Sequence, residues 1–101
     1  MVKFVVDIER DIIAVGGEVH ADAEAVLLEN DSKQQNLWGA NFYLFEKDPT
    51  KRIRFISLIN IRPRDKNFKM KIKDPAIRER VQKNAEKLLS LPDESLSSRN
   101  A

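Results

Sequence analysis

The chain has 101 residues, of which 42% are hydrophobic and 34% charged, and its formal net charge is +2. This length fits one domain, and the mixture of apolar and charged residues excludes a wholly disordered chain. No apolar run approaches the roughly 18–20 residues of a membrane helix, and the absence of cysteine excludes disulfides and thiolate metal sites. Because no signal-peptide pattern is present either, we expect a cytoplasmic protein without a membrane role.

The charge is unevenly distributed along the chain. Residues 1–50 carry 4 Lys/Arg and 10 Asp/Glu, a net charge of −6, whereas residues 51–101 carry 14 and 6, a net charge of +8. Nine basic residues fall within residues 51–73, where Asp65 is the only acidic residue. Such a segment is typical of a surface for nucleic acid or another acidic partner. Alternatively, the acidic first half of the chain neutralises it, within the fold or across a dimer.

Two strands are predicted at the start of the chain. Apolar residues alternate with polar ones over residues 2–8, which predicts a half-buried strand. The apolar residues 12–15 predict a second strand that returns beside the first as a hairpin. Gly16 and Gly17 follow directly, and paired glycines allow the backbone angles that end a strand.

Residues 20–29 are rich in alanine and leucine and contain no glycine or proline, which favours a helix. At about 100° per residue, Ala21, Ala25 and Leu28 share one face with Leu27 beside it, and we expect this face to pack on the sheet. The acidic residues of this region lie on the other face, toward water: Glu18, Asp22 and Glu29.

The second half of the chain predicts two more strands. Residues 37–45 are aromatic and apolar on both faces, which suits a central strand. Alternation over residues 52–62 predicts the next strand, which ends at Pro63 because proline cannot donate to the ladder. Residues 64–73 then form a basic loop.

A final helix is predicted after this loop. Asp74 and Pro75 form a helix start, with an aspartate cap followed by proline at the first helical position. Its buried stripe comprises Ile77, Val81, Ala85 and Leu88. Pro92 is expected to end the helix, and the polar residues 92–101 are expected to form a disordered tail.

The order of elements is strand, strand, helix, strand, strand, helix (ββαββα) over a single domain of residues 1–91. Short connections predict an α+β two-layer sandwich, with an antiparallel sheet of about four strands and two helices on one face. The other sheet face would carry Trp38 or Tyr43 together with Leu58. Because exposed apolar patches often mark association, we expect a homodimer.

Three blocks of the sequence resemble a small prokaryotic family of unknown function. They are residues 16–24 (GGEVHADAE), residues 37–41 (LWGAN) and residues 59–63 (INIRP), and the resemblance spans about residues 2–90. The family brings no established activity, so the resemblance implies where a site lies and no mechanism. Members often carry Ser-Gln-Gly after the Arg-Pro pair, whereas this chain has Arg64, Asp65 and Lys66.

We expect these blocks to converge on one pocket. The candidate ligand-binding residues are Gly16, Gly17, Asn41, Asn60 and Arg62. The planar donor fork of Arg62 suits an anionic small molecule. The leading hypothesis is therefore a small ligand-binding or protein-interaction module that recognises an anionic group.

Two alternatives belong to other functional classes. His20 and Glu24 lie close on a helix surface and are candidate catalytic residues, an acid–base pair of an enzyme, although the same pair can serve only to hold the helix start. Nucleic-acid binding would use the basic residues Arg52, Arg54, Arg64, Lys66 and Lys69. No metal site is expected with a single histidine and no cysteine, and no cofactor motif is present.

Overall fold

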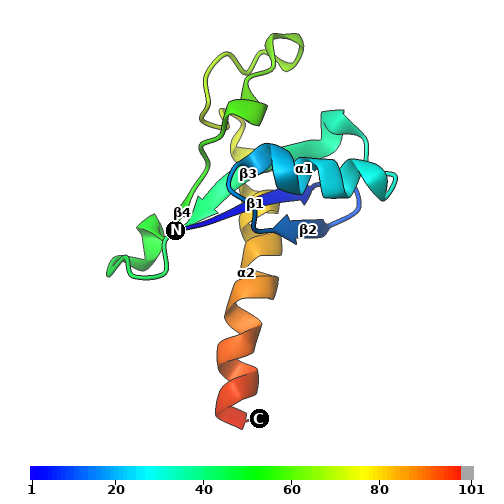
Figure 1. The fold of residues 1–101 in the computed structure, drawn as a ribbon. Coiled ribbons are helices and arrows are strands. Elements are labelled where there is room, and N and C mark those ends of the chain that lie inside the picture. The colour runs from blue at the N-terminus through cyan, green and yellow to red at the C-terminus, as the bar shows by residue number, and fades with distance from the viewer. Residues whose placement is uncertain (99–101) are drawn as a thin grey trace.

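The computed structural model describes the backbone of residues 1–98 and the side chains of residues 1–87 (Figure 1). In chain order the main elements are β1 (Val2–Asp7), β2 (Ile12–Val15), α1 (His20–Glu29), β3 (Leu37–Phe42), β4 (Ile53–Arg54) and α2 (Pro75–Ser98). Short 3-10 helices lie between them: η1 (Gln34–Asn36), η2 (Pro49–Lys51), η3 (Leu58–Asn60) and η4 (Pro63–Asp65). Among the described residues no helix is long and apolar enough to cross a membrane.

The strands form one antiparallel sheet in the order β2-β1-β3-β4, which confirms the predicted α+β class and the four-stranded antiparallel sheet. The predicted β1–β2 hairpin is also confirmed, and it pairs Asp7 with Ile12. At the turn, the buried carboxylate of Asp7 accepts hydrogen bonds from the backbone N–H of Glu9 (2.9 Å) and of Arg10 (3.1 Å). These bonds close the turn without the Asn-Gly pair common in hairpins.

The two helices pack on opposite faces of the sheet, so the prediction that both lie on one face is wrong. Phe4 and Val6 of β1 belong to a buried cluster with Val81 of α2, whereas Val5 belongs to a cluster with Leu27 of α1. Because successive residues of a strand point to opposite faces, the sheet lies between the helices (Figure 1). The physical reason is that Val5 of β1 and Leu37 of β3 add buried apolar side chains to the face opposite Phe4, Val6 and Trp38, so each face needs a cover.

Trp38 is therefore buried rather than placed on a free sheet face. It is 3% exposed and belongs to the cluster that α2 covers. Tyr43 is half-buried, and Leu58 lies outside the sheet in η3 with 73% of its surface exposed. Within the described residues both broad sheet faces are covered, so the expected homodimer would need another surface.

Helix α1 spans the predicted residues but turns a different face to the sheet. Its buried residues are His20, Ala23 and Leu27. The face expected to pack on the sheet, beside Leu27, is exposed: Ala21, Ala25 and Leu28. Small alanines occur all around this helix, so periodicity alone identifies its buried face poorly. Leu27 and the His20 ring, which bonds to the carbonyl of Ala40 in β3, lie on the face that packs against the sheet.

The strand predicted over residues 52–62 is wrong, because β4 comprises only two residues and η3 follows it. The Ser57 hydroxyl accepts a hydrogen bond from the backbone N–H of Ile59 (3.3 Å), and such local bonds compete with strand pairing. The strand predicted over residues 37–45 is central as expected, but β3 ends at Phe42.

Residues 57–73, called the 57–73 segment below, leave the sheet and return to the core at the fully buried Ile72. The segment forms the green and yellow loops above the sheet in Figure 1. Asn67 holds it together, because the two N–H groups of its side-chain amide are shared among three backbone carbonyls and its Oδ1 accepts from Lys73 N–H (2.8 Å). The three carbonyls belong to Asn60 (2.7 Å), Lys69 (2.8 Å) and Lys71 (3.0 Å).

The start of α2 confirms the prediction, since Asp74 Oδ1 accepts from the backbone N–H of Ala76 (2.8 Å) directly before the helix. Within the predicted stripe, Val81 and Ala85 are fully buried and Ile77 is half-buried.

The end of α2 differs from the prediction. The helix continues to Ser98, beyond Pro92, where the sequence predicts its end. The side chains from residue 88 onward, including Leu88, lie outside the described residues, as do residues 99–101 entirely. The disordered tail proposed for residues 92–101 stays a prediction.

Candidate functional site

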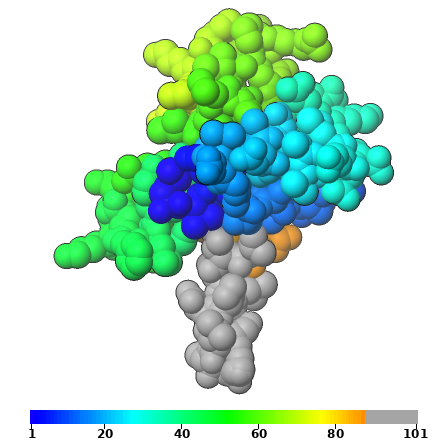
Figure 2. Space-filling model, in the orientation of Figure 1, coloured from blue at the N-terminus to red at the C-terminus, as the bar shows by residue number. Residues whose placement is uncertain are grey.

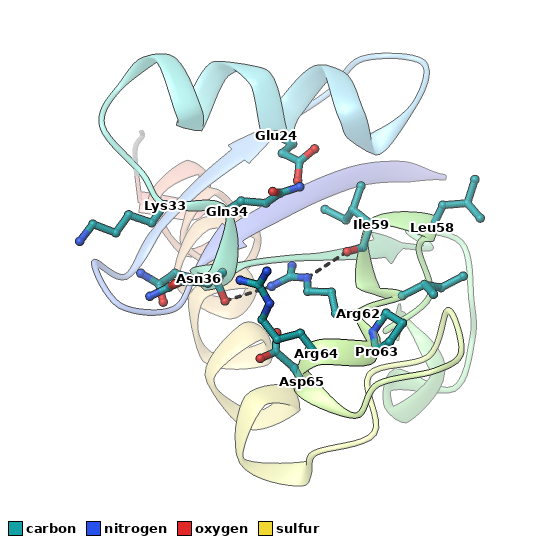
Figure 3. A pocket seen from close by; sticks show the side chains of 12 residues that line it. Glu24, Lys33, Gln34, Asn36, Leu58, Ile59, Arg62, Pro63, Arg64 and Asp65 are labelled. Carbon is teal, nitrogen blue, oxygen red and sulfur yellow. Dashed lines mark hydrogen bonds between the residues drawn. The ribbon is translucent and has the colours of Figure 1, made fainter.

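A cleft of about 880 Å³ lies between α1, η1 and the 57–73 segment (Figure 3). This volume falls within the range of small-molecule sites, roughly 300–1,000 Å³. Glu24 enters the cleft from α1, and Ile59 and Arg62 enter it from η3 and the residues that follow. Charged residues also line it: Lys33, Arg64 and Asp65.

The guanidinium of Arg62 is fixed in this cleft by three contacts. Its Nε donates to the carbonyl of Ile59 (3.2 Å), and its Nη1 donates to the carbonyl of Gln35 (3.0 Å). Its Cζ lies 4.1 Å from the ring centroid of Trp38, a cation–π contact. The remaining nitrogen, Nη2, is buried and has no hydrogen-bond partner among the described residues. Arg62 is thus held rigidly with one donor group unused.

Glu24 brings an unused acceptor to the same cleft. Its Oε2 is buried and lacks a partner within the part of the chain that the structure describes. Across these residues, no ion pair of 4.0 Å or less joins the Glu24 carboxylate to the Arg62 guanidinium. Burial lowers the pKa of Arg62, while the charges of Asp65 and Glu24 oppose this shift. Because arginine loses its proton only at strongly alkaline pH, the guanidinium keeps its charge at neutral pH.

Asn60 explains how Arg62 is positioned. The fully buried Asn60 amide accepts from Gly39 N–H through Oδ1 (2.8 Å) and donates through Nδ2 to the carbonyl of Gly39 (2.9 Å). These two bonds reproduce the pair that a neighbouring strand would make with β3. Nδ2 also donates to the carbonyl of Met70 (3.0 Å). Asn60 therefore fastens η3 to β3, and Arg62 follows two residues later. It is a structural residue here rather than a cleft residue.

His20 lies apart from this cleft. Its Nε2 is 2.7 Å from the carbonyl oxygen of Ala40 in β3, and the side chain is buried. Burial lowers the pKa of His20, although the hydrogen bond to Ala40 opposes that shift, as does a contact with the Asn41 side chain. No hydrogen bond between His20 and Glu24 occurs in the described residues, so the proposed acid–base pair stays a hypothesis without a contact in its favour.

The glycine pair connects β2 to α1 and lies outside the residues that line the cleft. Gly16 and Gly17 both have positive φ angles, +106° and +87°, which favour glycine. The Asp22 carboxylate accepts from the backbone N–H of Glu18 (3.0 Å) and of Val19 (3.3 Å) at the start of α1. The Asp22 carboxylate therefore already accepts from the backbone N–H groups that follow the glycine pair, which are the donors that an anion bound at this helix start would use.

Asn41 lies next to His20 and donates through Nδ2 to the carbonyl of Ile56 (3.2 Å). It is not among the residues that line the cleft. Of the five predicted ligand-binding residues, the structure therefore brings only Arg62 into the cleft, and Glu24 joins it from the predicted catalytic pair.

The basic residues proposed for nucleic-acid binding fall into two groups by their contacts. Arg54 pairs with Glu46 (3.0 Å) and lies 4.2 Å over the ring of Tyr43, and Arg52 donates to the backbone carbonyl of Glu46 (2.9 Å). The others are exposed in the 57–73 segment: Arg64, Lys66 and Lys69. The first group is engaged within the protein, and the second is free to meet a partner.

Trp38 and Gln35 contribute to the cleft without having been predicted to do so. Trp38 supports the Arg62 guanidinium through its ring, and Gln35 does so through its backbone carbonyl. The only sequence signal was that Trp38 and Arg62 both lie in blocks that carry the family resemblance. A backbone carbonyl leaves no signature in side-chain identity, so the part played by Gln35 was not accessible from the sequence.

Comparison with protein families finds a match over residues 1–88 to the family described as Protein of unknown function (DUF5674). Comparison with curated proteins and with solved structures finds no significant match.

Proposed function

For this chain, which belongs to the DUF5674 family of proteins of unknown function, we propose a binding function at the cleft between α1, η1 and the 57–73 segment. The ligand is a small molecule or chain terminus with an anionic group for Arg62 and a hydrogen-bond donor for Glu24. The observation that carries this proposal is that the buried Nη2 of Arg62 and the buried Oε2 of Glu24, both without a partner among the described residues, belong to residues lining one cleft.

The energetics of Arg62 support an anionic ligand. A buried polar atom without a partner costs roughly 1–3 kcal/mol, and more when the group is charged. The contacts with Ile59, Gln35 and Trp38 hold the guanidinium in place, so little side-chain entropy would be lost on binding. A carboxylate or phosphate on Nη2 would form a charge-assisted hydrogen bond and remove the penalty.

Glu24 restricts the ligand further. A purely anionic molecule large enough to reach both groups would meet repulsion from the Glu24 carboxylate, whose Oε2 can only accept while it is ionised. An amino or amide group on the same molecule would satisfy that oxygen. The two groups together favour a ligand that carries both a donor and an anion, such as an amino acid or a peptide terminus.

The proposal is tested by NMR titration of the side-chain Nε–H resonance of Arg62. Three probes are used: inorganic phosphate, glutarate and the amino acid glutamine. We expect glutamine to shift this resonance most. In Arg62→Lys, which keeps the charge but loses the fork, the titration follows the indole Nε1–H resonance of Trp38, because the Arg62 signal is lost. The affinity should fall about 10- to 100-fold. Arg64→Lys, at an exposed residue that lines the same cleft, is the matched control and should bind like the wild type.

Glu24→Gln separates the two halves of the proposal. It should weaken glutamine binding and leave glutarate binding equal or stronger, because a negative charge is removed. If none of the three probes shifts the Arg62 resonance, or if Arg62→Lys binds as tightly as the wild type, the cleft is not an anion-binding site. Glu24 and Arg62 would then be a solvent-separated structural pair.

A further inference from the structure

The 57–73 segment has an unusual distribution of polar and apolar residues. Its buried interior is largely polar, and the side chains that fill it are Ser57, Asn60 and Asn67. Several of its large apolar side chains face solvent instead: Leu58 (73% exposed), Phe68 (66%), Ile61 (41%) and Met70 (41%). These side chains are only partly covered in the folded monomer, and exposed apolar surface is typical of an interface.

The same segment is strongly basic. It contains six Lys/Arg residues and only Asp65 as an acid. Five of the six are exposed: Arg64, Lys66, Lys69, Lys71 and Lys73. Within the described residues, none of these five side chains forms an ion pair of 4.0 Å or less. A partner that fits this surface combines apolar side chains with negative charge.

The outer face of α1 has this complementary character. The apolar face that the sequence predicts for the core is exposed there, with Ala21, Ala25 and Leu28 along it. At 100° per residue, Asp22 and Glu29 lie roughly 40–60° from Ala25, and Glu18 precedes the helix, so these acids flank the apolar stripe rather than lying on the other face as the sequence predicts. Val26 of the helix and Val19 just before it are exposed as well, and α1 contains no lysine or arginine.

The two surfaces lie side by side on one molecule. Helix α1 contacts η3, which begins the 57–73 segment, and Figure 2 shows α1 (blue to cyan) directly below the segment (green to yellow) on the same side. When two copies are related by a two-fold axis, the 57–73 segment of each copy can face helix α1 of the other, so the same contact between opposite charges forms twice. Such pairing closes into a dimer.

We infer that a second copy of this chain covers the 57–73 segment. The exposed apolar and basic side chains of the segment pack against the apolar and acidic outer face of the second copy's α1. This homodimer does not depend on the proposed ligand. A nucleic acid fits the exposed surface less well, because Phe68 is its only aromatic residue, whereas Leu58, Ile61 and Met70 are aliphatic or thioether side chains that do not stack on bases.

The test is a charge-swap experiment on the full chain, with sedimentation equilibrium as the measurement and circular dichroism as the check of folding. We expect the wild type to be a dimer at about 50 mM salt and to dissociate toward monomer near 500 mM, where surface charges are screened. Lys69→Glu/Lys71→Glu reverses the basic surface, and Glu18→Lys/Glu29→Lys reverses the acidic one. Asp22 is left unchanged because it caps α1.

Each double variant alone should be monomeric at low salt, and an equimolar mixture of the two should form a heterodimer. Lys47→Glu/Lys87→Glu, which changes the net charge equally at exposed lysines outside both surfaces, should remain a dimer. A monomeric wild type, or a mixture of folded variants that does not associate, would overturn the proposal. Binding of a monomeric wild type to phosphatidylglycerol vesicles or to a single-stranded oligonucleotide would also overturn it and assign the surface to that partner.

Discussion

Asn60 shows how one side chain can replace a strand. Its amide pairs with both backbone groups of Gly39, where the next strand of a regular sheet would pair. An asparagine amide has the same donor and acceptor as a peptide group, so it can satisfy β3 while the main chain turns away. That turn frees residues 61–73 to form a separate surface and brings Arg62 to the cleft. Replacing Asn60 would leave two buried backbone groups without partners.

His20 predicts a specific pH dependence of stability. Its pKa in the folded protein is lowered by burial, whereas the unfolded chain titrates near the ordinary value of about 6.5. The unfolded state therefore binds more protons just below pH 6.5. The stabilising contribution of neutral His20 is complete above that pH and is lost as the pH falls toward the folded pKa, with a slope of at most about 1.4 kcal/mol per pH unit.

This dependence is measured by urea unfolding between about pH 5 and pH 8 for the wild type and His20→Gln. The glutamine amide can donate to the Ala40 carbonyl without titrating, so the difference in unfolding free energy between the two proteins should shrink as the pH falls. Parallel pH profiles would show that His20 does not change its protonation on unfolding.

At the scale of elements, the close approach of α1 and the 57–73 segment to β3 depends on Gly39. A Cβ on Gly39 would lie 2.8 Å from Cβ of Ser57 and 3.1 Å from Cδ2 of His20. Both neighbours are buried and come from different parts of the chain: Ser57 directly precedes η3, and His20 begins α1. The glycine in β3 thus allows two other elements to pack on the same strand position.

Gly39→Ala should therefore destabilise the fold by about 1–3 kcal/mol, the usual cost of overpacking a buried site. Thermal and urea unfolding measure this change. In the double variant Gly39→Ala/Ser57→Gly, the closest contact is removed, so its loss should be smaller than the sum of the two single losses. Strict additivity would show that Ser57 is not what opposes the added methyl group.

Elements whose signals are local were predicted well, and those that depend on distant contacts were not. The hairpin, the extent of α1 and the Asp74–Pro75 helix start depend on neighbouring residues, and all three are confirmed. Polar and apolar residues alternate over residues 52–62 as in a strand, yet the hydrogen bonds of the Asn60 and Ser57 side chains turn the backbone away from the sheet. The buried face of α1 was missed for a related reason, since alanine fits both the sheet and the solvent.

The site was predictable only in part. Arg62 was expected to hold an anion, and the cleft supports that role. Glu24 was expected to orient His20, but the ring of His20 binds the backbone of β3 and leaves Glu24 with Arg62. Helical spacing places Glu24 near His20 on the helix surface, yet which neighbour it meets depends on the tertiary position of the 57–73 segment.

At the scale of the whole molecule, two kinds of interior hold the chain together. The sheet is covered on both faces by apolar clusters that include Phe4, Val5 and Val6 of β1. The 57–73 segment is held mainly by polar side chains, above all by Asn67. Since apolar burial provides most of the cooperative stability of a domain, we expect this segment to open independently, before the sheet.

Amide hydrogen exchange tests this order of stability, in salt high enough to screen the charged surfaces. Asn67→Ala should accelerate exchange within residues 57–73 by about tenfold or more, the effect of losing buried hydrogen bonds, and should leave β1 amides unchanged. Asn30→Ala removes a comparable but exposed side-chain bond to the backbone and serves as the control. Equal acceleration across β1 and the segment would mean that the two unfold as one unit.

The position of Trp38 gives the protein an optical probe of its own cleft. It is the single tryptophan of the chain, and its buried indole lies under the guanidinium of Arg62. An anion that binds the Arg62 guanidinium changes the electric field at the Trp38 ring. The intrinsic fluorescence of the unlabelled protein therefore reports occupancy of the cleft directly, and libraries of metabolites can be screened by emission alone.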